Sequence, residues 1–199
     1  MKLLLDPGHG WANGVGDPGA CRGDFHETNW TFQFSGYLAE CVRHLCEPWE
    51  IASTRLLAAD NPTLEARGEM SLEFGADLVL SIHVNASISP LDHGGLTFYW
   101  PGNASGRAVE DIIARALPEP LHRNGGYGIA ATDSARPDDD WLKRVRACLI
   151  HHDMTSVLFE VGYCSSVGDL AAIMRPAIQS GLCAAALAGL ARFRALNER

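Results

Sequence analysis

The sequence predicts an α/β fold with a largely parallel central sheet and helices on both faces. Short apolar runs alternate along the chain with helical segments of about ten residues or more. Residues 77–86 are nearly all apolar and β-branched, as expected of a strand that is covered on both faces. The 199 residues contain no linker, repeat or break in composition. We therefore expect residues 1–199 to form a single domain.

Short apolar runs predict the strands, and apolar residues that recur every three to four positions predict the helices. The expected strands are residues 3–5, 49–57, 77–86, 94–100 and 156–161. The expected helices are residues 25–46, 64–74, 105–117, 167–174 and 176–196.

Other segments carry turn and cap signals. Residues 11–24 are rich in glycine and polar residues and show neither period, which predicts a long loop. Asp24 is a plausible N-cap of the first helix, with Glu27 where a capping box places its acid. Gly75 is expected to end the second helix as a C-cap. Residues 121–140 look irregular, and the pattern of 142–150 is ambiguous between helix and strand.

Charge and hydropathy exclude several classes of protein. The net charge of −8 argues against a nucleic-acid partner, because such a protein would carry a basic patch. No segment has the length of a membrane span. Only three leucines follow Met1-Lys2, so no signal-peptide core is visible. We expect a monomer that is made in the cytoplasm, or exported by a route that this sequence does not contain.

Polar side chains stand where buried strands would otherwise continue. His9 follows the first strand in the turn Asp6-Pro7-Gly8-His9-Gly10, and His83 and Glu160 lie near the ends of two other strands. Parallel strands bring their carboxyl ends to one edge of a sheet, where α/β proteins build their sites.

Glu27 completes the set, because it begins the helix that follows the loop leaving His9. Two imidazoles, a carboxylate and an open fourth position make a catalytic zinc site. Glu160 would supply the acid or base that such a site requires.

Each of these residues also has an ordinary structural interpretation. His83 fits a hydrogen-bonded core histidine, Glu27 a helix cap, and Glu160 an ion pair at a strand end. Taken singly, these structural interpretations are favoured. The four together indicate a site, although they do not form a compact ligand motif.

Several short stretches carry a resemblance to a known family, and they occur in the same order along nearly the whole chain. They are LDPGHG at 5–10, GDPGA at 16–20, Glu27, SIHVNA at 81–86 and LFEVGY at 158–163. The chain resembles the zinc-dependent N-acetylmuramoyl-L-alanine amidases of the Amidase_3 type, which are peptidoglycan hydrolases.

The resemblance implies a zinc site, a catalytic acid and a substrate. One Zn²⁺ per chain would be held by His9, Glu27 and His83, and Glu160 would be the catalytic glutamate. The substrate would be the amide between N-acetylmuramic acid and L-alanine in peptidoglycan. The resemblance also implies a mainly parallel sheet of about six strands, and it favours a strand at 142–150.

Four further residues are candidates for supporting roles. Asp6 and Asn85 are expected to orient the two histidines through hydrogen bonds, on the basis of their positions in sequence. Arg55 and Arg67 match positions where the family tends to carry arginine, and we interpret them as structural or supporting residues.

Alternative functions remain open at this stage. A zinc carboxypeptidase or endopeptidase acting on wall peptides would use a similar ligand set with a separate glutamate. A catalytically silent regulator that binds wall precursors belongs to a different class. If the chain is an amidase, the sequence fits a phage or prophage endolysin and a domain of a larger exported enzyme equally well. Its role would be wall lysis or remodelling.

Overall fold

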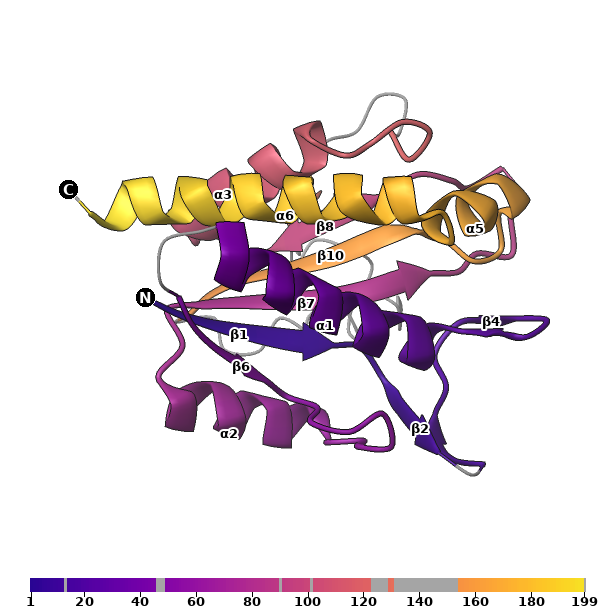
Figure 1. Cartoon of the computed structure of the whole chain (residues 1–199), viewed down its shortest axis with the longest axis horizontal. Coiled ribbons are helices and arrows are strands. Elements are labelled where there is room, and N and C mark those ends of the chain that lie inside the picture. The colour runs from indigo at the N-terminus through magenta and orange to yellow at the C-terminus, as the bar shows by residue number, and fades with distance from the viewer. Residues whose placement is uncertain are drawn as a thin grey trace.

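A six-stranded sheet runs through the centre of the computed structural model, which describes residues 1–12, 14–45, 49–89, 91–100, 102–122, 129–130 and 154–198. In spatial order its strands are β6 (Glu50–Ser53), β1 (Lys2–Pro7), β7 (Leu78–Asn85), β10 (Thr155–Tyr163), β8 (Leu96–Tyr99) and β9 (Ile129–Ala130). The first four are mutually parallel, and β8 runs antiparallel to β10. The largely parallel sheet is therefore confirmed (Figure 1).

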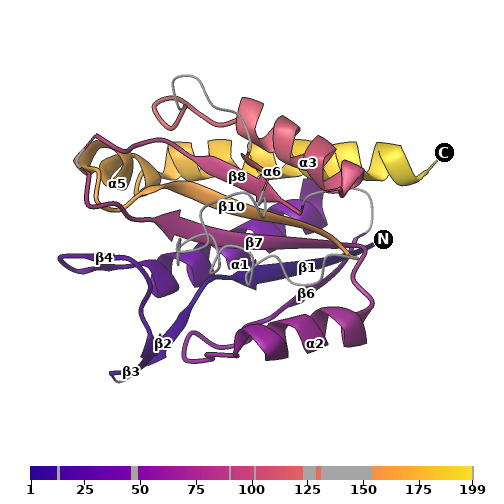
Figure 2. The same ribbon diagram turned by 180° about the vertical axis from the view of Figure 1, so that it is seen from behind.

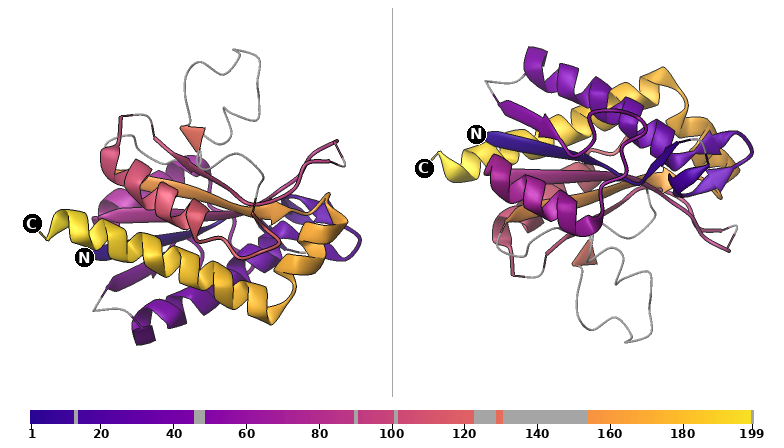
Figure 3. Two further views of the ribbon diagram at one scale, coloured as in Figure 1. Left: turned by 90° about the horizontal axis from the view of Figure 1, so that it is seen from above. Right: turned by 90° about the horizontal axis from the view of Figure 1, so that it is seen from below.

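Helices cover both faces of this sheet, as predicted. They are α1 (Glu27–Leu45), α2 (Leu64–Phe74), α3 (Ala104–Arg115), α5 (Val167–Ile173) and α6 (Pro176–Asn197). Figure 1 shows α1 and α6 in front of the sheet, and α2 stands in front when the molecule is seen from behind (Figure 2). The views from above and below likewise place α1 and α6 together on one side of the strands (Figure 3).

The alternation of side chains along the strands separates the core from the polar residues. Leu78, Leu80, Ile82 and Val84 of β7 all join the apolar cluster that α1, α3 and α6 cover. The intervening residues of β7, which include His83, point to the opposite face. The larger apolar cluster therefore lies on the side of the sheet that these helices cover, and the other side carries His83 together with a smaller apolar cluster that includes Phe98 and Leu158.

The long loop expected at residues 11–24 is instead two short hairpins. β2 (Gly10–Ala12) pairs with β3 (Val15–Asp17), and β4 (Cys21–Arg22) pairs with β5 (Phe25–His26). Strands of two or three residues are too short for an alternating pattern to be recognised. Glycines with positive φ, such as Gly14 at 79°, allow the turns.

The expected helix termini are partly confirmed. Gly75 closes α2 in the left-handed conformation, with φ 66°, and its N–H bonds to the carbonyls of the last turn. Asp24 as the N-cap of the first helix is wrong, because β5 lies between Asp24 and the first residue of α1, Glu27. The strand expected at 142–150 lies outside the described residues, as do 123–128 and 131–140 of the segment expected to be irregular.

Within the described ranges, no single helix is both long and apolar enough to cross a membrane. The pair α5 and α6 passes that test only when taken together, and the two helices are bent by 81° at their junction. Residues along α6, among them Leu182, Leu190 and Phe193, are buried in the core of the domain.

Truncation of Phe159 tests the core assignment. This side chain is 0% exposed on β10, so Phe159→Ala should lower the free energy of unfolding by about 3–5 kcal/mol through lost burial and a cavity. Leu45→Ala is the control, because Leu45 is 72% exposed, and it should change that free energy by less than about 0.5 kcal/mol. Denaturant unfolding measures both, and equal effects would contradict the packing described.

Candidate metal centre and active site

The carboxyl ends of β1, β7 and β10 meet at one edge of the sheet, as their parallel pairing requires. Glu160 of β10 is the register partner of His83 on β7, so the two side chains lie on the same face. His9 lies two residues beyond the end of β1, and the N–H of Gly8 still bonds to the carbonyl of Ile82. Residues far apart in sequence are thereby brought together.

His9, Glu27 and His83 converge as predicted. One potential ligand atom from each lies within 4.8 Å of the others. Nε2 of His9 is 3.1 Å from Oε2 of Glu27, and Nδ1 of His83 is 3.0 Å from Oε1. Two imidazole nitrogens and one carboxylate oxygen are a donor set that suits Zn²⁺ and leaves a fourth position open. The residues present therefore fit the metal that the sequence implied.

Glu27 is held in place by the backbone rather than acting as a helix cap. Its Oε2 accepts a hydrogen bond from the N–H of Ala20 at 2.7 Å, and its Oε1 accepts one from the N–H of Val84 at 2.7 Å. Its position in the first turn of α1 also favours a negative charge. Both oxygens of the carboxylate are thus fixed before any ligand binds.

His9 has a conformation that few residues adopt without support. Its φ is 62°, in the left-handed region, where a residue other than glycine is strained. Its Nδ1 lies 2.8 Å from Oδ2 of Asp17, whose Oδ1 accepts a hydrogen bond from the N–H of Gly19 at 2.9 Å. A carboxylate on the far nitrogen is how metal-binding histidines are usually oriented.

Two glycines leave room for the rings. A Cβ on Gly8 would lie 2.5 Å from Cε1 of His83. A Cβ on Gly19 would lie 2.5 Å from Oε2 of Glu27, and φ there is +69°. Larger residues at these positions would push the ligands apart.

The charges of this cluster stabilise one another. Burial alone would lower the pKa of His9, but hydrogen bonds and charges from Glu27 and Asp17 raise it to about 9. Burial works against the ionised form of Glu27 too, yet His83 and His9 hold its pKa well below the usual range. Without metal, Glu27 is therefore a carboxylate beside a protonated His9.

Glu160 has the properties expected of a buried acid or base. Its side chain is 6% exposed, and its Oε2 has no hydrogen-bond partner among the described residues. Burial, helped by the negative charge of Glu27, raises its pKa well above the ordinary value, while His9 opposes the shift. A nearby cation would favour its ionised form.

The expectation that Asp6 orients a histidine ring directly is wrong. Its carboxylate accepts hydrogen bonds from Thr54 at 2.6 Å, from Ser81 at 2.7 Å and from Arg67. Arg67 donates in turn to the carbonyl of His9 at 2.7 Å, so Asp6 acts on the backbone of the ligand through an arginine. Asp6 lies one residue before the end of β1 and three residues before His9, and its side chain is engaged by Thr54, Ser81 and Arg67 instead of the ring.

The other two candidates also contact backbone groups. Arg55 donates to the carbonyls of Gly8 at 3.2 Å and Thr28 at 3.0 Å, which flank two of the proposed ligands. Asn85 accepts from the N–H of Ala86 at 2.7 Å, and its Nδ2 has no partner among the described residues. The expected hydrogen bond from Asn85 to His83 is therefore not found among the described residues.

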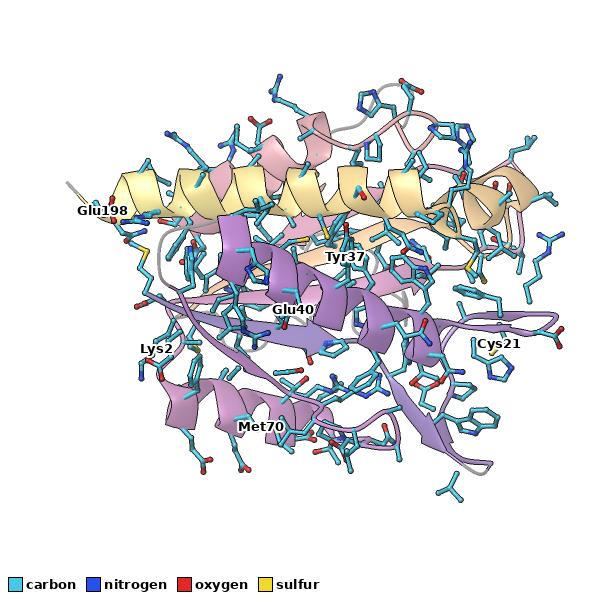
Figure 4. The ribbon with its side chains drawn as sticks, viewed as in Figure 1. Lys2, Cys21, Tyr37, Glu40, Met70 and Glu198 are labelled. Atoms are coloured by element: carbon cyan, nitrogen blue, oxygen red, sulfur yellow. The ribbon has the colours of Figure 1, made fainter. Side chains whose placement is uncertain are left out.

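Asp17 is the residue that sequence reasoning missed. It lies within the GDPGA stretch, but only the fold of the β2–β3 hairpin turns its carboxylate toward His9. The neighbouring β4–β5 hairpin carries Cys21, which is exposed near this edge of the sheet (Figure 4).

A metal-type donor set beside a buried carboxylate, one oxygen of which has no hydrogen-bond partner among the described residues, is the arrangement of a metal-dependent hydrolase. The family model of N-acetylmuramoyl-L-alanine amidases matches residues 3–192. The chain belongs to this family, and it is an enzyme that hydrolyses the amide between N-acetylmuramic acid and L-alanine in peptidoglycan. None of the curated protein sequences compared with the chain matches it.

Solved structures of amidases share the fold. The catalytic domain of CwlV from Bacillus (Paenibacillus) polymyxa var. colistinus is 22% identical, with a TM-score of 0.75 over 98% of this chain and 99% of that one. AmiC2 of Nostoc punctiforme is 21% identical, with a TM-score of 0.75 over 98% and 97%. Ami1 of Mycobacterium smegmatis is 19% identical, with a TM-score of 0.78 over 99% and 98%.

Asp17→Asn should weaken zinc binding by about 10–100-fold, because the amide no longer supplies the charge that orients His9. Competition with a chromogenic chelator measures the affinity. Asp24→Asn is the matched control, since Asp24 is an exposed acid of the next hairpin, and it should bind zinc as the parent does. Equal affinities in the two variants would contradict the role of Asp17.

Zinc affinity should also rise with pH. The pKa of His9 is about 9 in the metal-free protein, so a proton must leave its ring before a metal can bind. Affinity should increase by about tenfold per unit between pH 6 and pH 8, with about one proton released. Calorimetry in two buffers of different ionisation enthalpy counts that proton, and an affinity that stays constant over this range would exclude the coupling.

Proposed function

We propose that His9, Glu27 and His83 bind one Zn²⁺ per chain and that Glu160 is the catalytic acid and base of the amidase. The observation that carries the proposal is the convergence of the three donors around one point, with their ligand atoms within 4.8 Å of one another. The second support is Glu160, the register partner of His83, whose Oε2 has no protein partner among the described residues.

A zinc ion held by these residues supplies a Lewis acid that lowers the pKa of water toward neutrality and polarises the substrate carbonyl. Glu160 takes the proton of the attacking water and passes it to the nitrogen of the departing alanine. Its burial keeps bulk water from competing for that proton. Asp17 keeps the far nitrogen of His9 engaged, so that the ring presents Nε2 toward Glu27.

The buried arginines support this arrangement through the backbone. Arg67 and Arg55 bind the carbonyls of His9 and Gly8, and Arg55 also binds that of Thr28. They fix the backbone that carries two of the proposed ligands.

The enzyme acts on the cell wall as a monomer with the glycan–peptide polymer as its substrate, and its role is wall lysis or remodelling.

An amidase is favoured over the two rival functions. Membership of the amidase family over residues 3–192 argues against a carboxypeptidase or endopeptidase. The presence of Glu160 beside a complete ligand set argues against a silent regulator. Mass spectrometry of digested muropeptides distinguishes an amidase from a carboxypeptidase or endopeptidase, because an amidase leaves intact stem peptides with a free alanine amine.

Glu160→Gln and Glu160→Ala should keep bound zinc and lose peptidoglycan hydrolysis by at least about 100-fold, because no other side chain replaces the proton carrier. His83→Ala should lose both zinc and activity. Zinc is measured by atomic emission and hydrolysis by the release of soluble muropeptides.

Glu110→Gln is the matched control. Glu110 is a buried glutamate of α3 that bonds to Thr97, away from the site, and its replacement should leave hydrolysis within about threefold of the parent. Wild-type hydrolysis by Glu160→Gln would overturn the assignment of the catalytic residue. Zinc binding retained by His83→Ala would overturn the ligand set.

A further inference from the structure

The strand β10 contains a bulge directly after Glu160. Glu160 pairs with His83 of β7, but the next paired residues are Tyr163 and Asn85, so β10 advances by three residues while β7 advances by two. β10 therefore carries one extra residue at this point. A shift of one residue along a strand turns a side chain to the other face of the sheet. The direction of the Glu160 side chain thus depends on where β10 absorbs the extra residue.

The bulge takes one backbone N–H out of the sheet ladder. After the bulge, the N–H of Cys164 bonds to the carbonyl of Asn85 at 2.8 Å. The N–H of Tyr163 donates instead to Oδ2 of Asp169, at 2.9 Å. A buried N–H without an acceptor is costly, so a bulge at this position needs an acceptor from outside the sheet. Asp169 supplies that acceptor.

The same oxygen of Asp169 also holds the strand on the other side of β10. It accepts a hydrogen bond from the N–H of Gly94 at 2.6 Å, two residues before β8 begins. The first residue of β8, Leu96, is the antiparallel register partner of Glu160. Figure 1 shows α5, the helix that carries Asp169, at the carboxyl end of β10. One oxygen therefore ties the bulge to the start of β8, with Glu160 between the two attachments.

The backbone around Glu160 is closely packed as well as hydrogen-bonded. Asp169 is 3% exposed. A Cβ on Gly162, inside the bulge, would lie 3.3 Å from Oδ2 of Asp169 and 3.2 Å from Cδ2 of Leu121. A Cβ on Gly95 would lie 3.3 Å from the carbonyl oxygen of Glu160. These distances are shorter than ordinary van der Waals contacts, so the bulge has little room to rearrange while Asp169 is in place.

We propose that Asp169 is a positioning residue of the amidase, which fixes the bulge of β10 and so keeps the Glu160 carboxylate on the face of the sheet that carries His83. This inference rests on the proposed function, in which Glu160 is the catalytic acid and base. Asp169 acts through backbone N–H groups of β10 and of the segment before β8. The proposed metal ligands lie on other elements: His9 follows β1, Glu27 begins α1 and His83 belongs to β7. Loss of Asp169 should therefore impair proton transfer and spare the metal.

Replacement of Asp169 tests this role on a purified soluble muropeptide that contains the N-acetylmuramoyl-L-alanine bond. Asp169→Ala removes the acceptor and should lower kcat by at least about tenfold, because the proton carrier is misplaced. KM and zinc affinity should each stay within about threefold of the parent. Asp169→Asn keeps an oxygen that can accept both N–H groups, so its kcat should also stay within about threefold.

Glu110→Ala is the matched control for a general loss of stability. Glu110 is likewise a helical acid that is 3% exposed, and it bonds to Thr97 at 2.9 Å. Both alanine variants should lower the melting temperature, and kcat is measured well below it. In Glu110→Ala kcat should stay within about threefold of the parent, because that carboxylate does not hold the bulge.

A second pair of variants decides the matter if Asp169→Ala does not fold. Gly162→Ala crowds the carboxylate of Asp169 inside the bulge and should lower kcat by at least about threefold. Gly168→Ala is its control: the position is exposed in α5, and a Cβ there would lie 3.9 Å from Oγ of Ser166, an ordinary contact. Equal kcat values in these two glycine variants would then overturn the proposal.

Three results with folded Asp169 variants would overturn the positioning role. They are the parental kcat in Asp169→Ala, a loss of kcat matched by an equal loss of zinc affinity, and an Asp169→Asn variant as slow as Asp169→Ala. Glu160→Gln is measured in the same assay. An inactive Glu160→Gln beside a fully active Asp169→Ala overturns the positioning role alone, whereas an active Glu160→Gln overturns the catalytic assignment itself.

Discussion

The carboxylate of Glu27 is the interaction on which the site depends. It receives the N–H groups of Ala20 and Val84 and stands between His9 and His83. It therefore ties the hairpin after β1, the first turn of α1 and the end of β7 to one point. Burial disfavours this charge, and the two histidines together with the backbone donors offset that cost. A neutral residue here would leave two backbone donors and two imidazoles without their common partner.

Behind this carboxylate, a layer of buried polar groups supports the strained turn. Asp6, Thr54 and Ser81 hold Arg67, directly or through one another, and Arg67 and Arg55 hold the carbonyls of the turn. The left-handed conformation of His9 persists because its neighbours on both sides are bonded.

Much of this arrangement could be predicted from the sequence. Apolar runs located the strands, and parallel pairing required His9, His83 and Glu160 to share an edge. Asp17 could not be found in that way, because its position depends on a hairpin whose two strands are too short to show a pattern. The donors on Ala20 and Val84 are backbone groups, which no residue type reveals. The prediction of Asp24 as an N-cap is wrong because the local sequence does not distinguish a tight β-turn from the start of a helix.

Diffraction from crystals of the zinc-loaded protein, recorded on both sides of the zinc absorption edge, tests the central claim most directly. The account predicts one anomalous peak per chain, at about 2.0–2.2 Å from a ring nitrogen of His9, a ring nitrogen of His83 and an oxygen of Glu27. Glu160 should stand outside bonding distance, with room for water between it and the metal. A peak bound by Glu160 in place of Glu27, or a peak away from these residues, would contradict the account.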